Sequence, residues 1–318
     1  MTPWLTLLMP TLNGADYLDA ALASIARERD PGVRIVAVDG GSTDGTRDVL
    51  SAYADRLTIE VHSRPDSEGW VWSTNLALSR AATPYCALLH QDDLWLPGRA
   101  ATMRALTEGF PDADLAVGGA RFVDGAGRTV GRLSLPWRLG GRAETHLSAN
   151  AALAGLLVQN ALACPAPVFR TEAARAVGGL DAELWYTADW DFWIKLAARG
   201  GVAVTPDARA AFRVHAASQT VRGSRDAAAF LAQMDAVLDR HGGTLVQSAR
   251  TDALAAGRFS NRVNTTLAAR IHGGRANLAG LAAQALRLGP SGLRRYLAAS
   301  RLTERVAARL RAGLHASA

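Results

Sequence analysis

Strand and helix patterns alternate regularly along the N-terminal part of this 318-residue chain. Short apolar runs bounded by turn residues are typical of buried strands, and apolar residues that recur every three or four positions are typical of helices. Predicted strands cover residues 5–9, 33–38, 57–62 and 85–89, and predicted helices lie between them, at 16–28, from the turn at 40–45 to residue 54, and at 70–81. Strands that are joined by helices run parallel, so this order predicts a parallel sheet with helices on both faces.

The rest of the sequence predicts the second half of this α/β domain, followed by a region that contains helix patterns alone. The expected elements are a helix at 97–108, a strand pair at 115–123 and 129–133, a loop at 136–147, a helix at 149–158, an extended segment at 165–170, a short helix after Thr171, a helix at 189–199 and two short strands within 202–214. After about Ser218 only Ala- and Leu-rich helix patterns occur, at roughly 224–240, 245–256, 260–271, 275–288 and 291–312. The sequence therefore predicts an α/β domain over 1–220 and a basic helical extension over 221–318.

Composition excludes several classes of protein. Hydrophobic residues make up 49% of the chain, which supports a full core and argues against disorder. No apolar stretch approaches the ~20 residues of a membrane-spanning helix, and the N-terminus lacks the basic and small-residue features of a signal peptide, so we expect a cytoplasmic protein. The two cysteines, Cys86 and Cys164, have no metal or redox spacing and are expected to be buried thiols.

The C-terminal part of the chain is basic. The net charge is +6, and from Thr244 onward the acids are only Asp252 and Glu304. Basic amphipathic helices over 293–302 and 306–311 could lie on an anionic membrane surface, at its inner face, although a solvated helix face would look the same. No aromatic-interleaved motif or zinc spacing predicts a nucleic-acid partner, and the sequence leaves a homo-oligomer open.

Polar loops follow three of the predicted strands, at 11–13, 39–46 and 91–93. In an open α/β sheet such loops converge on one edge, where ligands bind. Asp92 and Asp93 end a buried strand, and because adjacent carboxylates repel, we expect a divalent cation carrying a nucleotide diphosphate beside them. Segment 40–45 could equally be a helix-capping turn. Neither a Gly-x-Gly-x-x-Gly fingerprint nor a P-loop is present.

Five segments together resemble inverting glycosyltransferase family 2. They read Pro10-Thr11-Leu12-Asn13, Val38-Asp39-Gly40-Gly41-Ser42-Thr43-Asp44-Gly45-Thr46, Gln91-Asp92-Asp93, Ala188-Asp189-Trp190-Asp191-Phe192-Trp193, and Arg213-Val214-His215-Ala216-Ala217-Ser218-Gln219-Thr220. The resemblance covers about 4–220. It implies the GT-A fold, a Rossmann-like nucleotide-diphospho-sugar transferase architecture with a mixed, mostly parallel sheet and helices on both faces.

The resemblance also implies a donor site for a nucleoside diphosphate sugar. Its residues would be Thr11, Leu12, Asn13, Asp39 and Ser42, with Asp92 near the ribose or sugar and Asp66 in a third loop near the base. Asp93 would coordinate Mn²⁺ or Mg²⁺, and His215 would be a further ligand or a diphosphate contact. Ser218 and Thr220 could steady the diphosphate. Gln91 carries no charge and is given no metal role.

The same resemblance makes Asp189 the candidate general base. One carboxylate opposite the leaving diphosphate would take the proton of the acceptor hydroxyl. Without the family, Asp189 looks like a helix N-cap. Asp191 and Trp190 are weaker candidates for acceptor contacts, and either tryptophan of this helix could instead belong to the core.

The function that follows is inverting, metal-assisted transfer of a hexosyl or deoxyhexosyl group to a hydroxyl acceptor. That acceptor could be a glycan, a lipid-linked glycan or a small molecule of bacterial polysaccharide or glycoconjugate biosynthesis. A non-catalytic nucleotide-sugar-binding or scaffold protein would share the fold. So would a nucleotidyltransferase, but that class needs a Gly-rich basic loop after the first strand, which Pro10-Thr11-Leu12-Asn13-Gly14 does not provide.

Overall fold

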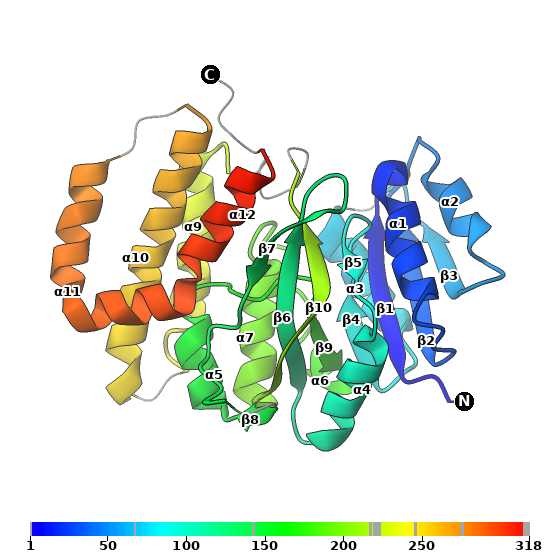
Figure 1. Ribbon diagram of the computed structural model, residues 1–318, viewed down its shortest axis with the longest axis horizontal. Coiled ribbons are helices and arrows are strands. Elements are labelled where there is room, and N and C mark those ends of the chain that lie inside the picture. The colour runs from blue at the N-terminus through cyan, green and yellow to red at the C-terminus, as the bar shows by residue number, and fades with distance from the viewer. Residues whose placement is uncertain are drawn as a thin grey trace.

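A mixed sheet runs through the molecule, with helices packed on both of its faces (Figure 1). The computed structural model describes residues 2–66, 68–141, 144–215, 218, 224–244, 247–273 and 277–313. Strand order in the described sheet is β3-β2-β1-β4-β9-β6-β10-β5, with β7 added beside β6 and β8 beside β10. The long ladders β1–β2, β2–β3 and β6–β10 are parallel, so the predicted fold class is confirmed.

The N-terminal half follows the predicted alternation. Its elements are β1 (Leu5–Thr11), α1 (Ala15–Ala26), β2 (Val33–Asp39), α2 (Thr46–Ala52), β3 (Thr58–Ser63), α3 (Trp70–Arg80) and β4 (Tyr85–Leu88). Side chains alternate across a strand, so each face of β1 joins a different core. Leu7 and Met9 pack with α1, whereas Leu8 packs in the core that holds α3. Both faces of β1, β2 and β4 are buried, which explains their apolar runs, whereas the edge strand β3 is mostly exposed.

The second half completes the sheet with antiparallel strands. Its elements are β5 (Leu94–Trp95), α4 (Arg99–Gly109), β6 (Leu115–Val123), β7 (Thr129–Leu133), β8 (Thr145–Leu147), α5 (Ala149–Leu156), β9 (Pro167–Arg170), α6 (Thr171–Ala176), α7 (Ala188–Gly200) and β10 (Val202–Arg213). The prediction of two strands in 202–214 was wrong, because β10 is one strand whose pairing with β6 shifts register between Thr205 and Ala210. β8 lies within the predicted loop 136–147, where its three residues are too few to show an alternating pattern.

Four helices follow in the described part of the extension: α9 (Ala227–His241), α10 (Gln247–Ile271), α11 (Leu278–Ser300) and α12 (Leu302–Arg311). Two predicted helices, 245–256 and 260–271, form the single helix α10, since Gly257 between them weakens a helix but, unlike proline, does not break it. α11 is kinked at Gly289, where φ is 69°, immediately before Pro290. Within the described residues, no helix is both long and apolar enough to cross a lipid bilayer.

The extension packs directly on the sheet domain. Phe230 and Met234 of α9 and Ala308 of α12 belong to the same buried cluster as Phe122 of β6 and Trp193 of α7. α12 crosses β7 so closely that a Cβ on Gly131 would lie 3.1 Å from the Ala308 Cβ. The two predicted regions thus share one core, and the boundary near residue 220 stays a prediction. α11 is the outermost of these helices in Figure 1.

Candidate functional site

A cavity of about 620 Å³ opens where the C-terminal ends of β1, β2 and β4 meet the start of α7 and the C-terminal helices. Residues of all five sequence motifs line it. They include Thr11, Leu12, Asn13, Gly40, Gln91, Asp92, Asp189, Trp190, His215 and Ser218. Thr220 lies outside the described residues. Segments that are up to about 200 positions apart therefore surround one space, as the topology of a parallel sheet predicts.

Gln91 ties two of these loops together. Its Oε1 accepts a hydrogen bond from the Leu12 backbone N at 2.8 Å, and its Nε2 donates to the Leu12 carbonyl oxygen at 3.0 Å. A Cβ on Gly14 would lie 2.3 Å from the Gln91 side-chain amide, so a larger residue at position 14 would displace this amide. Sequence reasoning missed this clamp. It leaves the Leu12 side chain more than half exposed at the cavity.

Asp39 is fully buried and orders the second loop. Its carboxylate accepts hydrogen bonds from Arg47 Nε at 2.8 Å and from the Ser42 backbone N at 3.1 Å, and the Ser42 hydroxyl is a third donor. Burial acts to raise the pKa of Asp39, but the bonds from Ser42 and Arg47 outweigh it and lower the pKa. Asn13 joins the same network through its backbone N, which donates to Ser42 Oγ at 2.9 Å. Asp39 therefore does not line the cavity, but it holds the loop at the cavity wall in place from behind.

Asp66 is placed apart from the other predicted donor residues. It is exposed in the turn after β3, beyond Pro65, whose Cα would lie 2.9 Å from a Cβ on Gly41. Asp66 thus follows the segment that contacts the Gly41 turn. It does not line the cavity that the other motifs form.

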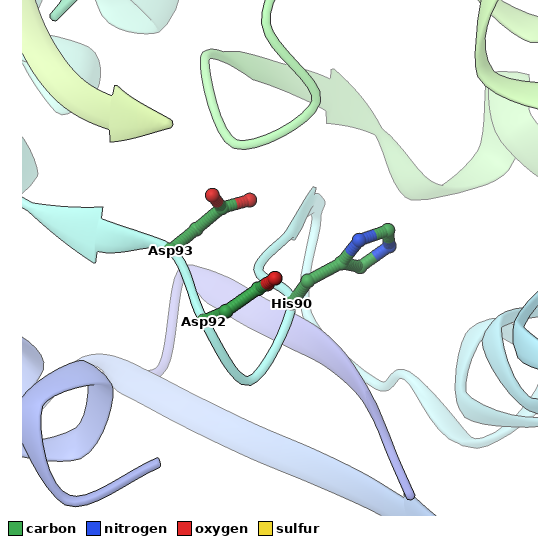
Figure 2. A group of neighbouring side chains, drawn as sticks. All are labelled: His90, Asp92 and Asp93. Carbon is green, nitrogen blue, oxygen red and sulfur yellow. The ribbon is translucent and has the colours of Figure 1, made fainter. Parts of the chain in front are cut away.

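The side chains of His90, Asp92 and Asp93 extend from one loop after β4 (Figure 2). One ligand atom from each lies within 4.8 Å of the others. Asp92 faces the cavity, and its Oδ2 lies 2.9 Å from His215 Nε2. Asp93 is 1% exposed and accepts a hydrogen bond from the Arg213 backbone N at 3.0 Å, while its Oδ2 is buried without a described partner.

The two acids have opposite pKa shifts. Burial and the neighbouring Asp92 charge raise the pKa of Asp93 well above its usual range. Burial also acts to raise the pKa of Asp92, but the hydrogen bond from His215 and the charges of His90 and His215 lower it overall. Asp92 is therefore the acid that stays ionised at the cavity surface.

Buried Arg213 explains how β10 brings His215 to this loop. Its Nε donates to the Asp92 carbonyl oxygen at 2.7 Å, and its Nη1 donates to the carbonyl oxygens of Asp124 at 3.0 Å and Gly125 at 2.9 Å. The ring of Tyr17, at the start of α1, lies 4.9 Å from the His215 ring between centroids. The Arg-x-His motif thus combines a structural arginine with a histidine that faces the cavity.

Asp189 is the second residue of α7 and is half-buried in the cavity wall. It is not the N-cap, which is Thr187. Its Oδ2 accepts a hydrogen bond from Asn160 Nδ2 at 3.1 Å. Burial raises its pKa to about 6 against the opposing bonds from Asn160 and from the Trp190 backbone N. Such a carboxylate is ionised at neutral pH and still basic enough to accept a proton efficiently.

Asp191 and Trp190 differ in their relation to this cavity. Asp191 is fully buried away from it, where Lys195 Nζ at 3.0 Å, His241 Nε2 at 2.6 Å and Arg240 Nη1 at 3.2 Å surround its carboxylate. It joins α7 to α9 and is not brought to the acceptor side. Trp190 lines the cavity but is 1% exposed, and its Nε1 donates to the Leu156 carbonyl oxygen at 2.7 Å.

Several lining residues were not expected from the sequence. His90 and Tyr17 flank predicted motifs, so their proximity could have drawn attention to them. Arg305 and Arg309 come from α12, about 115 residues after Asp189, and no local pattern indicated that they reach the cavity.

The family model described as glycosyl transferase family 2 matches residues 6–154. TuaG of Bacillus subtilis, which is named for teichuronic acid biosynthesis, is 33% identical over 100 residues, 30% of this chain and 39% of TuaG. A PGL/p-HBAD biosynthesis glycosyltransferase of Mycobacterium bovis is 28% identical over 195 residues, 61% of this chain and 69% of that protein. The chain thus spans only part of the curated relatives that it matches.

Solved structures with low sequence identity share the fold. TarS 1-349 of S. aureus in complex with UDP superposes with a TM-score of 0.64 at 16% identity, over 98% of this chain and 89% of TarS. The mannosyltransferase PcManGT from Pyrobaculum calidifontis, in complex with GDP-Man and Mn²⁺, has a TM-score of 0.61 at 18% identity, over 98% of this chain and 87% of PcManGT. The match over residues 6–154 assigns this part of the chain to glycosyltransferase family 2, and the solved structures share its GT-A fold.

Proposed function

We propose that this protein transfers a sugar from a nucleoside diphosphate sugar to a hydroxyl group of an acceptor, with inversion at the anomeric carbon. The observation that carries the proposal is one cavity with two different carboxylates in its wall. Asp92 is ionised beside His215, and Asp189 has a pKa of about 6. Relatives named as glycosyltransferases, and structural neighbours in complex with UDP or GDP-Man, support it.

The donor end of the cavity suits a divalent cation. The buried Asp93 Oδ2 lacks a described hydrogen-bond partner, and carboxylate oxygens with imidazole nitrogens suit Mn²⁺. Asp92, Asp93 and His215 would hold Mn²⁺ or Mg²⁺, with His90 adjoining. When bound, the cation would offset the negative charge of the leaving diphosphate.

Asp189 would supply the general base at the other end. Asn160 Nδ2 donates to Oδ2 and the Trp190 backbone N donates to Oδ1 at 2.7 Å, and each carboxylate oxygen keeps a further lone pair that could accept a proton from an acceptor hydroxyl. As that oxygen forms its bond to the anomeric carbon, Asp189 takes the hydroxyl proton, and the bond to the diphosphate breaks with its electron pair on the leaving oxygen. Attack opposite the leaving group inverts the anomeric centre.

Donor binding gives the test of this function. We expect a UDP-, GDP- or dTDP-sugar to raise the melting temperature when Mn²⁺ is present, by mass action. Asp92→Asn should raise the Mn²⁺ concentration for the half-maximal shift by about 10-fold or more, since even outer partners of metal ligands contribute 10–100-fold.

Asp112→Asn is the matched control, because Asp112 is exposed in the turn before β6, at the opposite end of the sheet. Asp93→Asn is measured in parallel. An unchanged Mn²⁺ requirement in both the Asp92 and the Asp93 variants would contradict the cation site, and no stabilisation by any nucleotide sugar would contradict the function.

We also propose that the outer face of α11 contacts an anionic membrane surface, which would place the protein at the inner face of the membrane. Leu286 is 83% exposed, Leu278 57% and Leu297 53%, and Arg287 and Arg294 are exposed on the same helix. Apolar side chains beside arginines are typical of helices that lie in the membrane interface. The contact is thus on α11, while α12 packs against the sheet domain.

Leu286→Glu should reduce partition onto vesicles that contain phosphatidylglycerol by about 10-fold, as burying a leucine contributes roughly 1.5–3 kcal/mol. A flotation assay measures this. The control is Val61→Glu, since Val61 is 47% exposed on β3, at the opposite end of the molecule from α11 (Figure 1). Equal losses in the two variants, or none in either, would rule out the α11 contact.

A further inference from the structure

Helix α12 brings two arginines into the cavity wall. Its other side is tied to β7 and the segment after it, because Glu304 Oε2 accepts a hydrogen bond from the Ser134 backbone N at 2.6 Å and Arg311 Nη1 donates to the Val130 carbonyl oxygen at 3.2 Å. Arg305 and Arg309 lie one helical turn apart and line the cavity. Their position is therefore set by packing of α12 on the sheet domain.

These arginines have no anionic partner among the described residues. Arg305 Nη2 donates to Asn264 Oδ1 at 3.0 Å and Nη1 to the Ser300 carbonyl oxygen at 3.5 Å, and both acceptors are neutral. No ion pair of the described chain includes either arginine. Burial and the like charge of Arg309 lower the pKa of Arg305 to about 10. Both guanidinium groups are half-buried, and charges that are removed from water are normally paired, so this arrangement indicates an anion from outside the chain.

The arginines belong to the Asp189 end of the cavity. Tyr186, three residues before Asp189, is half-buried and lines the same cavity, and Arg305, Arg309 and Asp189 all act electrostatically on its hydroxyl. Asn264, which holds Arg305, lies on α10. The donor end is instead formed by Leu12, Asp92 and His215.

We propose that Arg305 and Arg309 bind an anionic group, a phosphate or a carboxylate, on the acceptor, close to the hydroxyl that Asp189 deprotonates. This rests on the proposed glycosyl transfer. Two guanidinium groups present several donors to such oxygens, and charge-assisted hydrogen bonds are the strong ones. The C-terminal extension, outside the residues matched by the family model, would then select the acceptor.

Calorimetric titration of the full-length chain, with UDP and Mn²⁺ present, tests this. The probes are glycerol 1-phosphate, glucuronate and uncharged glycerol. We expect one or both anionic probes to bind and glycerol not to bind. Arg309→Gln should weaken that binding by about 10- to 100-fold, as one or two charge-assisted hydrogen bonds contribute. Arg262→Gln, at an exposed position of α10, is the matched control and should bind as the parent does.

The second variant is Arg305→Lys, which keeps the charge and loses the hydrogen-bond geometry. Because Arg305 is partly buried, the melting temperature of this variant is recorded beside its affinity, so that a folding defect is detected. Three outcomes would overturn the proposal: no binding of either anionic probe, equal binding by the parent and Arg309→Gln, or a loss of UDP affinity in Arg309→Gln as large as its loss of probe affinity. The last would assign the arginines to the donor. Failure of every nucleotide sugar to bind would instead contradict the glycosyl transfer itself.

Discussion

Asp189→Asn is expected to fold and bind the donor as the parent does, and to lose transfer by a factor of about 10²–10⁴, the usual contribution of a general base. The amide that replaces the carboxylate has nearly the same shape but cannot accept the hydroxyl proton. In the parent, transfer should fall about 10-fold per pH unit below about 6, where the Asp189 carboxylate becomes protonated.

The stability of this variant gives a second, independent readout. The folded-state pKa of Asp189, about 6, is above its usual 3.8. The favourable contribution of Asp189 to the free energy of unfolding is therefore present at low pH and lost as pH rises through 6. At pH 8 the parent contains an unfavourable half-buried charge that Asn removes, and the melting temperature of the variant should equal or exceed that of the parent. Undiminished transfer at saturating donor, or a pH profile without a break near 6, would remove Asp189 as the base.

Asp191→Asn should have the opposite effects, although Asp191 is only two residues further along α7. Lys195, Arg240 and the His241 ring surround its fully buried carboxylate, and burial is outweighed by His241 and Lys195, which lower its pKa to about 2. Breaking a buried ion pair costs up to 3–5 kcal/mol, but Lys195 and Arg240 are partly exposed, so we expect a loss of about 2 kcal/mol. The melting temperature should fall by about 3 °C, with transfer per folded molecule retained.

Acid denaturation tests the same ion cluster. A lowered carboxyl pKa contributes stability above pH 3.8 that is lost as the pH falls toward 2. The difference in stability between the parent and Asp191→Asn should therefore shrink over that range. Asp181→Asn is the matched control, because Asp181 also pairs with Arg240 but at the surface, where such pairs contribute little. Equal melting temperatures for Asp191→Asn and Asp181→Asn would contradict the role of the buried cluster. A large loss of transfer in folded Asp191→Asn would return Asp191 to the acceptor site.

The sequence was enough to predict the N-terminal half of the fold and the position of its loops. β1, β2 and β4 are buried on both faces, and their apolar runs indicate this directly, whereas β3 is a mostly exposed edge strand. Parallel topology then brings the loops that contain Leu12, Ser42 and Asp92 to one edge without any knowledge of side-chain contacts. Short elements such as β8, with three residues, were missed because their local pattern is too brief.

Roles within pairs of neighbouring acids were harder to assign. Asp92 and Asp93 are equivalent in a motif, yet the turn after β4 directs Asp92 to the cavity and Asp93 to the backbone of Arg213. Helix geometry places positions two apart about 200° from one another, so Asp189 and Asp191 could have been assigned to opposite faces of α7 in advance. Which face meets the cavity and which meets α9 still depended on how the helices pack.

The sequence by itself determined that the chain builds an open α/β sheet with polar loops at one edge, because strand and helix periodicity and right-handed parallel connections are local properties. Tertiary structure decided which carboxylates face the cavity, that Asp39 serves the loop from behind, and that α12 adds Arg305 and Arg309 to the wall. Those outcomes depend on long-range packing, in which helices more than a hundred residues apart in sequence share one buried core, and no short window of sequence contains that information.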